Sequence, residues 1–173
     1  MSLPLPRAGA AGRDTHRVLA ALLAVATVAL DQSTKALARG LLEGRGRLSY
    51  LGDLFRLELT RNAGAFLSLG SSLPPGLRGP ILTWGVALLA LGTAWVALRH
   101  RGSPAVSAGA ALVAGGGLGN LWDRLAANGL VADFMNLGLG RLRTGIFNVA
   151  DLAIVTGVAL LVWPRRGDRA DRP

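Results

Sequence analysis

Four apolar windows, each close to the length of a membrane-spanning helix, constrain this chain more than any other feature. They cover residues 18–38, 80–98, 105–122 and 146–163. Crossing the hydrocarbon core of a bilayer takes about 20 mainly apolar residues, and as few as about 17 suffice. The second and third windows contain no charged residue, and 51% of the whole chain is hydrophobic. We therefore expect an all-α membrane protein, in which residues 1–173 form one integral domain with four transmembrane helices.

The basic residues predict how these helices are oriented. Four spans place both tails, residues 1–17 and 164–173, on one side of the membrane, and the loops 39–79 and 123–145 on the other. The tails and the short link between the second and third windows hold these basic residues: Arg7, Arg13, Arg17, Arg99, Arg101, Arg165, Arg166, Arg169 and Arg172. Because such residues concentrate in short cytoplasmic segments, we expect cytoplasmic termini. A cleaved signal peptide is the alternative for the first window, but the polar DQSTK continuation favours a retained helix.

The first outer loop contains a strand pattern. Apolar residues alternate with polar ones over residues 55–60, which is typical of a half-buried strand. Pro74, Pro75 and Gly76 then break the chain before the second window. We expect a small β-rich platform on the outer surface, built from the first outer loop. The glycine- and arginine-rich stretch 138–145 in the second outer loop suggests a flexible connection.

Composition excludes several kinds of chemistry. The chain has no cysteine, which removes disulfides, thiolate metal sites and cysteine nucleophiles. Its histidines, His16 and His100, fall at the expected cytoplasmic ends of helices, so neither a Ser-His-Asp triad nor an H-E-x-x-H zinc site is supported. Ser33 and Lys35 are two residues apart on one helix and point to different faces. The net charge of +9 is scattered between apolar blocks, which favours membrane lipid headgroups over nucleic acid as partners.

Aspartates are the catalytic candidates that remain. Asp151 lies near the start of the fourth window, and Asp133 lies on the loop that leads into it. Two carboxyl groups that share one proton can activate water against a peptide bond, and their titration then belongs to the pair. The alternative for Asp151 is an acidic residue at a helix N-terminus, stabilised by the helix dipole. These residues alone do not decide between the two interpretations.

Other polar residues share helical faces with these candidates. Asn148 is three residues before Asp151, and Asn120 shares a face with Asp123 and Arg124 at the outer end of the third window. Gly115 and Gly119 have the G-x-x-x-G spacing that lets a neighbouring helix approach closely. Asp31 and Lys35 are four residues apart, and an ion pair between them would explain why both are tolerated in a bilayer.

Five segments in this order resemble lipoprotein signal peptidase, also called signal peptidase II. They are DQSTK at 31–35, NAGAF at 62–66, GNLWDR at 119–124, VADF at 131–134 and FNVAD at 147–151. The resemblance implies an endopeptidase of the bacterial inner membrane with its site facing the periplasm, and we expect it to be a monomer. Its substrates would be prolipoproteins, cut just before a diacylglyceryl-modified cysteine, and it would need neither cofactor nor metal. A non-catalytic membrane assembly factor and a small transporter are the alternatives.

The resemblance also implies a role for each candidate residue. Asp133 and Asp151 would form the catalytic pair. The residues lining the site or binding substrate would be Asn62, Gly64, Asn120, Arg124 and Asn148. Asp31, Lys35 and Asp123 would support the fold. One departure from the family is Leu152, where a small polar residue is common, and this bears on substrate preference more than on chemistry.

Overall fold

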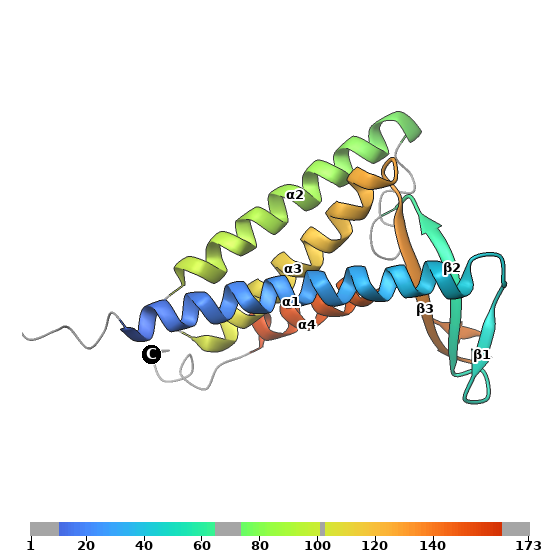
Figure 1. The fold of residues 1–173 in the computed structure, drawn as a ribbon, viewed down its shortest axis with the longest axis horizontal. Helices are drawn as coiled ribbons and strands as arrows, with labels where there is room; N and C mark the ends of the chain where they lie inside the picture. The colour runs from blue at the N-terminus through green and yellow to red at the C-terminus, as the bar shows by residue number, and fades with distance from the viewer. Residues whose placement is uncertain (1–10, 65–73, 101–102, 164–173) are drawn as a thin grey trace, which may run out of the picture.

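The computed structural model describes residues 11–64, 74–100 and 103–163, which form four helices and a small antiparallel sheet at one end of them (Figure 1). The elements are α1 (Ala11–Leu42), β1 (Leu48–Tyr50), β2 (Phe55–Asn62), α2 (Pro75–Arg99), α3 (Pro104–Ala126), β3 (Val131–Leu139), β4 (Leu142–Arg143) and α4 (Val149–Val162). Predictions for residues 1–10, 65–66, 101 and 164–173 lie outside the described residues.

Each apolar window overlaps one helix. Among the described residues, three helices contain stretches that are long and apolar enough to cross a membrane: Thr15–Leu42 in α1, Gly79–Arg99 in α2 and Pro104–Ala126 in α3. With 32 residues, α1 is about 48 Å long and exceeds the hydrocarbon core, which is about 30 Å thick. The fourth helix, α4, is also apolar but has 14 residues. The chain is therefore mostly helical and has the character of a membrane protein.

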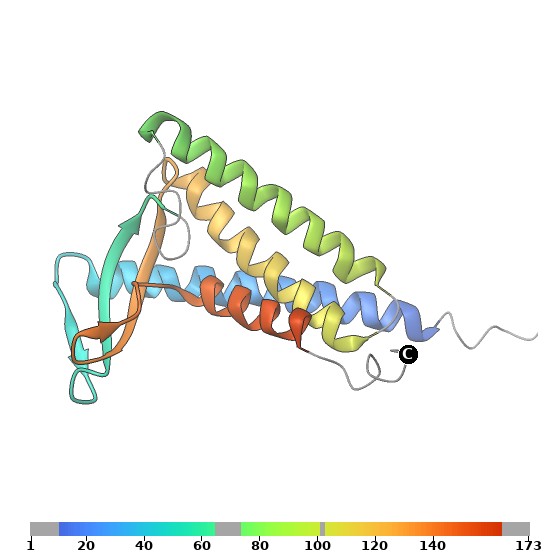
Figure 2. The same cartoon turned by 180° about the vertical axis from the view of Figure 1, so that it is seen from behind.

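The most buried helix is α3, which lies between the other three (Figure 2). Its small residues permit this position. A Cβ atom added to Gly115 would lie 2.7 Å from the carbonyl oxygen of Ala24, and one added to Gly119 would lie 2.5 Å from Oδ2 of Asp31. Both neighbours belong to α1. The predicted close approach of a helix at this G-x-x-x-G pair is confirmed, because any side chain at either glycine would separate α3 from α1.

The sheet is built from both outer loops. Its strand order is β1-β2-β3-β4, all antiparallel, with Leu57 opposite Met135 and Thr60 opposite Asp133. The strand predicted over residues 55–60 is confirmed as part of β2. The sequence suggested a platform from the first loop alone, whereas the structure adds β3 and β4 from the second.

The expectation of a flexible connection at residues 138–145 is wrong. Gly138 pairs with Arg143 across a hairpin, and Gly140 supplies the positive φ of 58° that the turn needs. The Asn136 side chain ties the hairpin together, since its Nδ2 donates to the carbonyl oxygen of Thr144 at 2.6 Å and its Oδ1 accepts from Arg143 Nε at 2.6 Å.

The sheet rests on the end of α1. Ala38, Leu42 and Phe134 are buried together, with Leu57 and Leu59 of β2 packed against them. The beginning of α1 and the end of α4 lie at the opposite end of the helices, away from the sheet (Figures 1 and 2). The junction of helices and sheet is therefore formed by elements that are far apart in the sequence, among them α1 and β3.

Candidate functional site

Strand β3 brings Asp133 to this junction. Side chains of a strand alternate between its faces, so Val131, Asp133 and Leu137 share one face and line a cavity of about 250 Å³. Phe134 points the other way, into the core against α1. Sequence reasoning placed Asp133 on a loop; in the structure it is fixed in a ladder, opposite Thr60 of β2.

The first turn of α4 holds Asp151. Asn148 is the N-cap residue of this helix, and its Oδ1 accepts from the backbone N of Asp151 at 3.0 Å. Asp151 Oδ2 accepts in return from the backbone N of Asn148 at 3.1 Å. This capping box satisfies two amides at the helix start. Asp151 also lines the cavity beside Asp133. The same side chain therefore caps the helix N-terminus and faces the cavity, so the two interpretations of Asp151 do not exclude each other.

Both oxygens of the Asp133 carboxyl accept hydrogen bonds. Oδ2 accepts from Asn62 Nδ2 at 2.8 Å, and Oδ1 accepts from Asn148 Nδ2 at 2.7 Å. The pKa of Asp133 is raised to about 6, mainly by burial and also by the negative charge of Asp151, while the two asparagine amides and Lys35 act in the opposite direction.

Asn120 and Asn148 connect the two carboxyl groups. Asn120 Nδ2 donates to Asp151 Oδ1 at 3.0 Å, and Asn148 Nδ2 donates to Asn120 Oδ1 at 3.0 Å in addition to its bond with Asp133. The helical spacing in the sequence put Asn148 and Asp151 on one face, and the structure adds the contact with Asn120 on α3. The asparagines thus form a continuous polar layer behind the pair of aspartates.

Arg124 links the cavity to the first outer loop. Its Nη2 donates to the carbonyl oxygen of Gly64 at 3.0 Å, and its Nη1 donates to that of Asn120 at 3.3 Å. Its Nε is buried without a hydrogen-bond partner among the described residues. Gly64 donates its backbone N–H to Asn62 Oδ1 at 2.8 Å, which fixes the amide of Asn62 so that its nitrogen faces Asp133.

The three predicted supporting residues lie behind the asparagines. The predicted ion pair of Asp31 and Lys35 is confirmed, with 2.8 Å between Oδ2 and Nζ and both side chains fully buried. Lys35 also pairs with Asp123 at 3.1 Å, and Arg39 binds the other oxygen of Asp123 at 3.0 Å. Sequence reasoning did not include Arg39, although its position four residues after Lys35 places it on the same face of α1.

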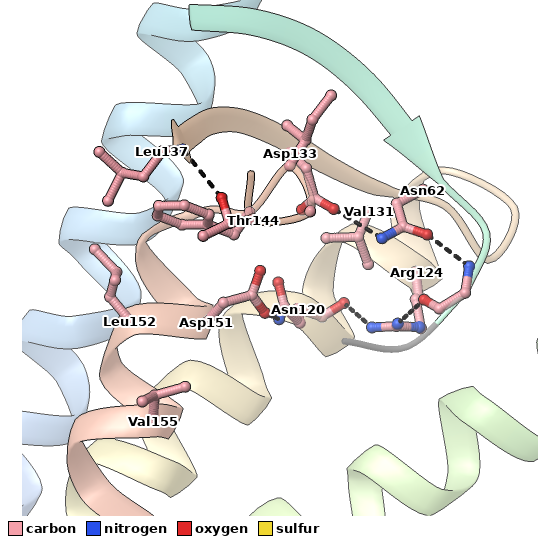
Figure 3. A pocket seen from close by; sticks show the side chains of 14 residues that line it. Asn62, Asn120, Arg124, Val131, Asp133, Leu137, Thr144, Asp151, Leu152 and Val155 are labelled. Atoms are coloured by element: carbon pink, nitrogen blue, oxygen red, sulfur yellow. Dashed lines mark hydrogen bonds between the residues drawn. The ribbon is translucent and has the colours of Figure 1, made fainter. Parts of the chain in front are cut away.

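The cavity has a polar end and an apolar end (Figure 3). The polar end holds the two aspartates together with Asn62, Asn120 and Arg124. The lining residues that sequence reasoning did not name are Val131, Leu137, Thr144, Gly145, Ile146, Phe147 and Val155. Val131 and Leu137 belong to β3, Val155 belongs to α4, and the other four lie in the segment that joins β4 to α4. Leu152, noted as a departure from the family pattern, also lines the cavity.

This arrangement suits acid–base chemistry on a partly apolar substrate. Two coupled carboxyls lie in one cavity, with amide donors holding their positions and an apolar wall beside them. No group of three or more His, Asp or Glu side chains arranged to hold a metal ion occurs among residues 11–64, 74–100 and 103–163.

Comparison with known proteins gives consistent matches along most of the chain. Residues 23–165 match the family described as Signal peptidase (SPase) II. The chain is 36% identical over 140 residues to a lipoprotein signal peptidase of Aquifex aeolicus, covering 81% of each chain. It is also 36% identical over 150 residues to a lipoprotein signal peptidase of Methylocella silvestris, covering 85% of each.

A solved structure shares the fold. A bacterial membrane enzyme determined at 2.3 Å resolution by the in meso method superposes with a TM-score of 0.73, covering 90% of this chain and 92% of the other. The two sequences are 21% identical. The match therefore shows that the helices and the sheet together form a fold that occurs in a membrane enzyme.

Proposed function

The chain belongs to the signal peptidase II family, a family of membrane proteases that remove signal peptides from prolipoproteins, and we propose that it does so by aspartic catalysis with Asp133 and Asp151. The observation that carries this proposal is that both carboxyls line one cavity and each accepts an asparagine amide. The cleaved bond is the one before a diacylglyceryl-modified cysteine.

In the proposed reaction, a water molecule lies between the two carboxyls. The ionised carboxyl takes a proton from this water, and the resulting hydroxide adds to the carbonyl carbon of the residue before the cysteine. The protonated carboxyl stabilises the developing charge on the carbonyl oxygen. When the intermediate collapses, the C–N bond breaks, and the carboxyl that took the proton from water passes it to the cysteine nitrogen, which leaves as an amine. One water is consumed, its hydroxyl ending on the new carboxylate.

The surrounding residues suit supporting roles in this reaction. Asn62, Asn120 and Asn148 hold the carboxyl oxygens in place at 2.7–3.0 Å. Gly64 leaves room for the substrate backbone, and Arg124 ties the segment that contains it to α3. The apolar wall of the cavity, which includes Leu152 and Val155, accepts the signal peptide.

We further propose a four-span topology in the bacterial inner membrane, with α4 as the fourth span. The beginning of α1 and the end of α4 lie away from the sheet (Figure 1), which supports placing them on the side of the membrane opposite the site. The basic residues of the short segments support the cytoplasm as their side and the periplasm as the side of the site. Residues 146–148 lie outside the helix but continue the apolar window before it. A span as short as α4 is accommodated by thinning of the bilayer, by snorkelling of flanking residues or by oligomerisation.

The direct test is cleavage of a diacylglyceryl-modified prolipoprotein by the purified protein in detergent. Wild type should release the signal peptide, and Asp133→Asn and Asp151→Asn should each remain folded and inactive. Glu43→Gln is the matched control, because Glu43 is an exposed acid paired with Arg61 away from the cavity. It should keep wild-type activity.

Two results would reject the proposal. Wild-type protein that fails to cleave several such substrates would argue against protease function and favour an assembly factor. Full activity in either asparagine variant would show that the substituted aspartate is not catalytic, whatever the protein cleaves.

A further inference from the structure

Two buried carboxylates outside the cavity hold the chain directly in front of the two proposed catalytic residues. Asp31 Oδ1 accepts from the backbone N of Ala150 at 3.0 Å, and Ala150 immediately precedes Asp151. Asp123 Oδ2 accepts from the backbone N of Ala132 at 3.0 Å, and Ala132 immediately precedes Asp133. The same contact is therefore made twice, once for each member of the pair.

One side chain joins these two carboxylates. Lys35 Nζ lies 2.8 Å from Asp31 Oδ2 and 3.1 Å from Asp123 Oδ2, and it donates to Asn120 Oδ1 at 2.9 Å. An ammonium group has three protons to donate, so these three oxygens account for all of them. The Lys35 side chain is fully buried, and it has no place among the residues that line the cavity.

Stability alone does not explain this cluster. Burying an ion pair costs several kcal/mol per ion in desolvation, and well-packed apolar residues often replace such a pair without loss. Here α1 supplies Asp31 and Lys35, α3 supplies Asp123, and the two backbone amides belong to β3 and α4. The cluster thus connects the four elements whose relative positions determine how far apart the two catalytic carboxyls lie.

We propose that Lys35 is a positioning residue for the catalytic pair, acting through Asp31 and Asp123 to set the separation of Asp151 and Asp133. This inference rests on the proposed function, because it assigns Lys35 a part in that reaction. Support of the fold by the three residues, as implied by the family resemblance, is a weaker statement, since it predicts loss of stability but no specific effect on the chemistry.

Lys35 also sets the orientation of an amide. Because an ammonium group can only donate hydrogen bonds, Asn120 must turn its oxygen toward Lys35, and its nitrogen then faces Asp151. Asn148 in turn must donate to the same oxygen of Asn120. Lys35 thus orients the amide of Asn120, and Asn120 in turn orients the amide of Asn148. These two amides donate to the two catalytic carboxyls.

The charged groups around the pair come from α1 and α3. Asp31 and Lys35 lie on α1, and Asp123 and Arg124 lie on α3. The positive charge of Lys35 lowers the pKa of Asp133. Loss of Lys35 should therefore move the titration of the Asp133 carboxyl to higher pH.

The test compares Lys35→Met with the double variant Lys35→Met/Asp31→Asn. The single variant leaves two buried carboxylates to one arginine and is expected to be unstable. The double variant keeps the charge of the cluster balanced, and the amide oxygen introduced at position 31 can still accept from the backbone N of Ala150. Arg39→Gln is the matched control, since Arg39 binds Asp123 on the oxygen that Lys35 does not use. Each protein is assayed for unfolding, for kcat and KM, and for the Asp133 carboxyl titration by ¹³C NMR.

We expect the folded double variant to lose roughly 10–100-fold in kcat, as for displaced supporting groups in other sites. Its KM should stay within about twofold, because Lys35 does not line the cavity. Its Asp133 midpoint should rise above the wild-type value, because without Lys35 the Asn120 amide is no longer oriented and the Asn148 donor, which lowers the pKa of Asp133, is held less well. Arg39→Gln should match wild type in kcat and midpoint. A folded double variant with wild-type kcat, or with an unmoved midpoint, overturns the proposal.

Two further outcomes are separable. If wild type cleaves no lipid-modified prolipoprotein, the proposed function fails, while the NMR midpoints still report whether Lys35 acts on the pair. If neither variant folds, the hydrogen exchange of two backbone amides in the wild-type protein tests the proposal. The Ala132 and Ala150 amides, held through one lysine, should open with the same free energy, and clearly different values would overturn the proposal.

Discussion

Replacing Asn148 by alanine should weaken both the fold and the chemistry, because this buried side chain serves both. Loss of the N-cap of α4 costs about 1 kcal/mol. Loss of the hydrogen bond from Nδ2 to the Asp133 carboxyl, 2.7 Å long, adds about 1.5–3 kcal/mol. We therefore expect a total destabilisation of about 3 kcal/mol and severe loss of activity. The pKa of Asp133 should also rise above its value near 6, because the Asn148 amide holds it down.

Asn148→Ser separates the two contributions. Serine is a good N-cap and accepts from the backbone N of Asp151, but it is too short to reach Asp133. Unfolding in mixed micelles should show that serine regains about 1 kcal/mol over alanine, whereas prolipoprotein cleavage should remain as low as in the alanine variant. Equal stability of the two variants would refute the capping estimate, and wild-type kcat in the serine variant would refute a need for the Asn148–Asp133 bond.

Three further predictions, the last with a matched control substitution, test separate parts of the structure. The pKa of Asp133 is about 6 in the folded protein and 3.8 in the unfolded chain. Ionisation of Asp133 therefore destabilises the folded state: the effect is complete at pH values above the folded-state pKa and absent below the unfolded-state pKa. The free energy of unfolding of Asp133→Asn, relative to that of wild type, should therefore rise by roughly 2–3 kcal/mol between about pH 4 and pH 8. A difference that does not change with pH would contradict the raised pKa. Leu152→Trp should narrow the cavity and raise KM by about tenfold without altering thermal unfolding; an unchanged KM would mean that the substrate avoids this wall. Gly119→Ala should destabilise the fold by about 1–3 kcal/mol, because the added Cβ would lie 2.5 Å from Asp31. Gly92→Ala is the control: nothing lies within 4 Å of its added Cβ, and it should stabilise α2 by about 0.5–1 kcal/mol. Equal effects of the two substitutions in a denaturation assay would contradict the close approach of α3 to α1.

Local patterns in the sequence predicted much of the structure. Alternation over residues 55–60 predicted β2, and the i,i+4 spacing of Asp31 and Lys35 predicted their ion pair. The apolar windows predicted the positions of the helices, although α4 begins at Val149 and not at residue 146. The reason is the capping box of Asn148 and Asp151, a short-range signal that was present in the sequence.

Long-range pairing explains what the sequence did not reveal. Strand β3 depends on β2, from which it is separated by two helices, and its glycine-rich end has little strand preference of its own. The bond from Ala150 to Asp31 joins residues 119 positions apart and uses a backbone amide, which leaves no mark in the sequence. Asp133 and Asp151 could be proposed as a catalytic pair from residue types and resemblance, whereas the contacts that hold these two residues could not be predicted.

The sheet that joins both outer loops has a consequence for biogenesis. Asn62 comes from the first of these loops and Asp133 from the second, and their neighbours in space include Lys35 near the chain start and Asp151 near its end. Contacts of such high sequence separation form late. On the proposed mechanism, a nascent chain still emerging from the ribosome has no competent site. The proposed site is complete only when α4, which supplies Asp151, has been synthesised and has packed against α3.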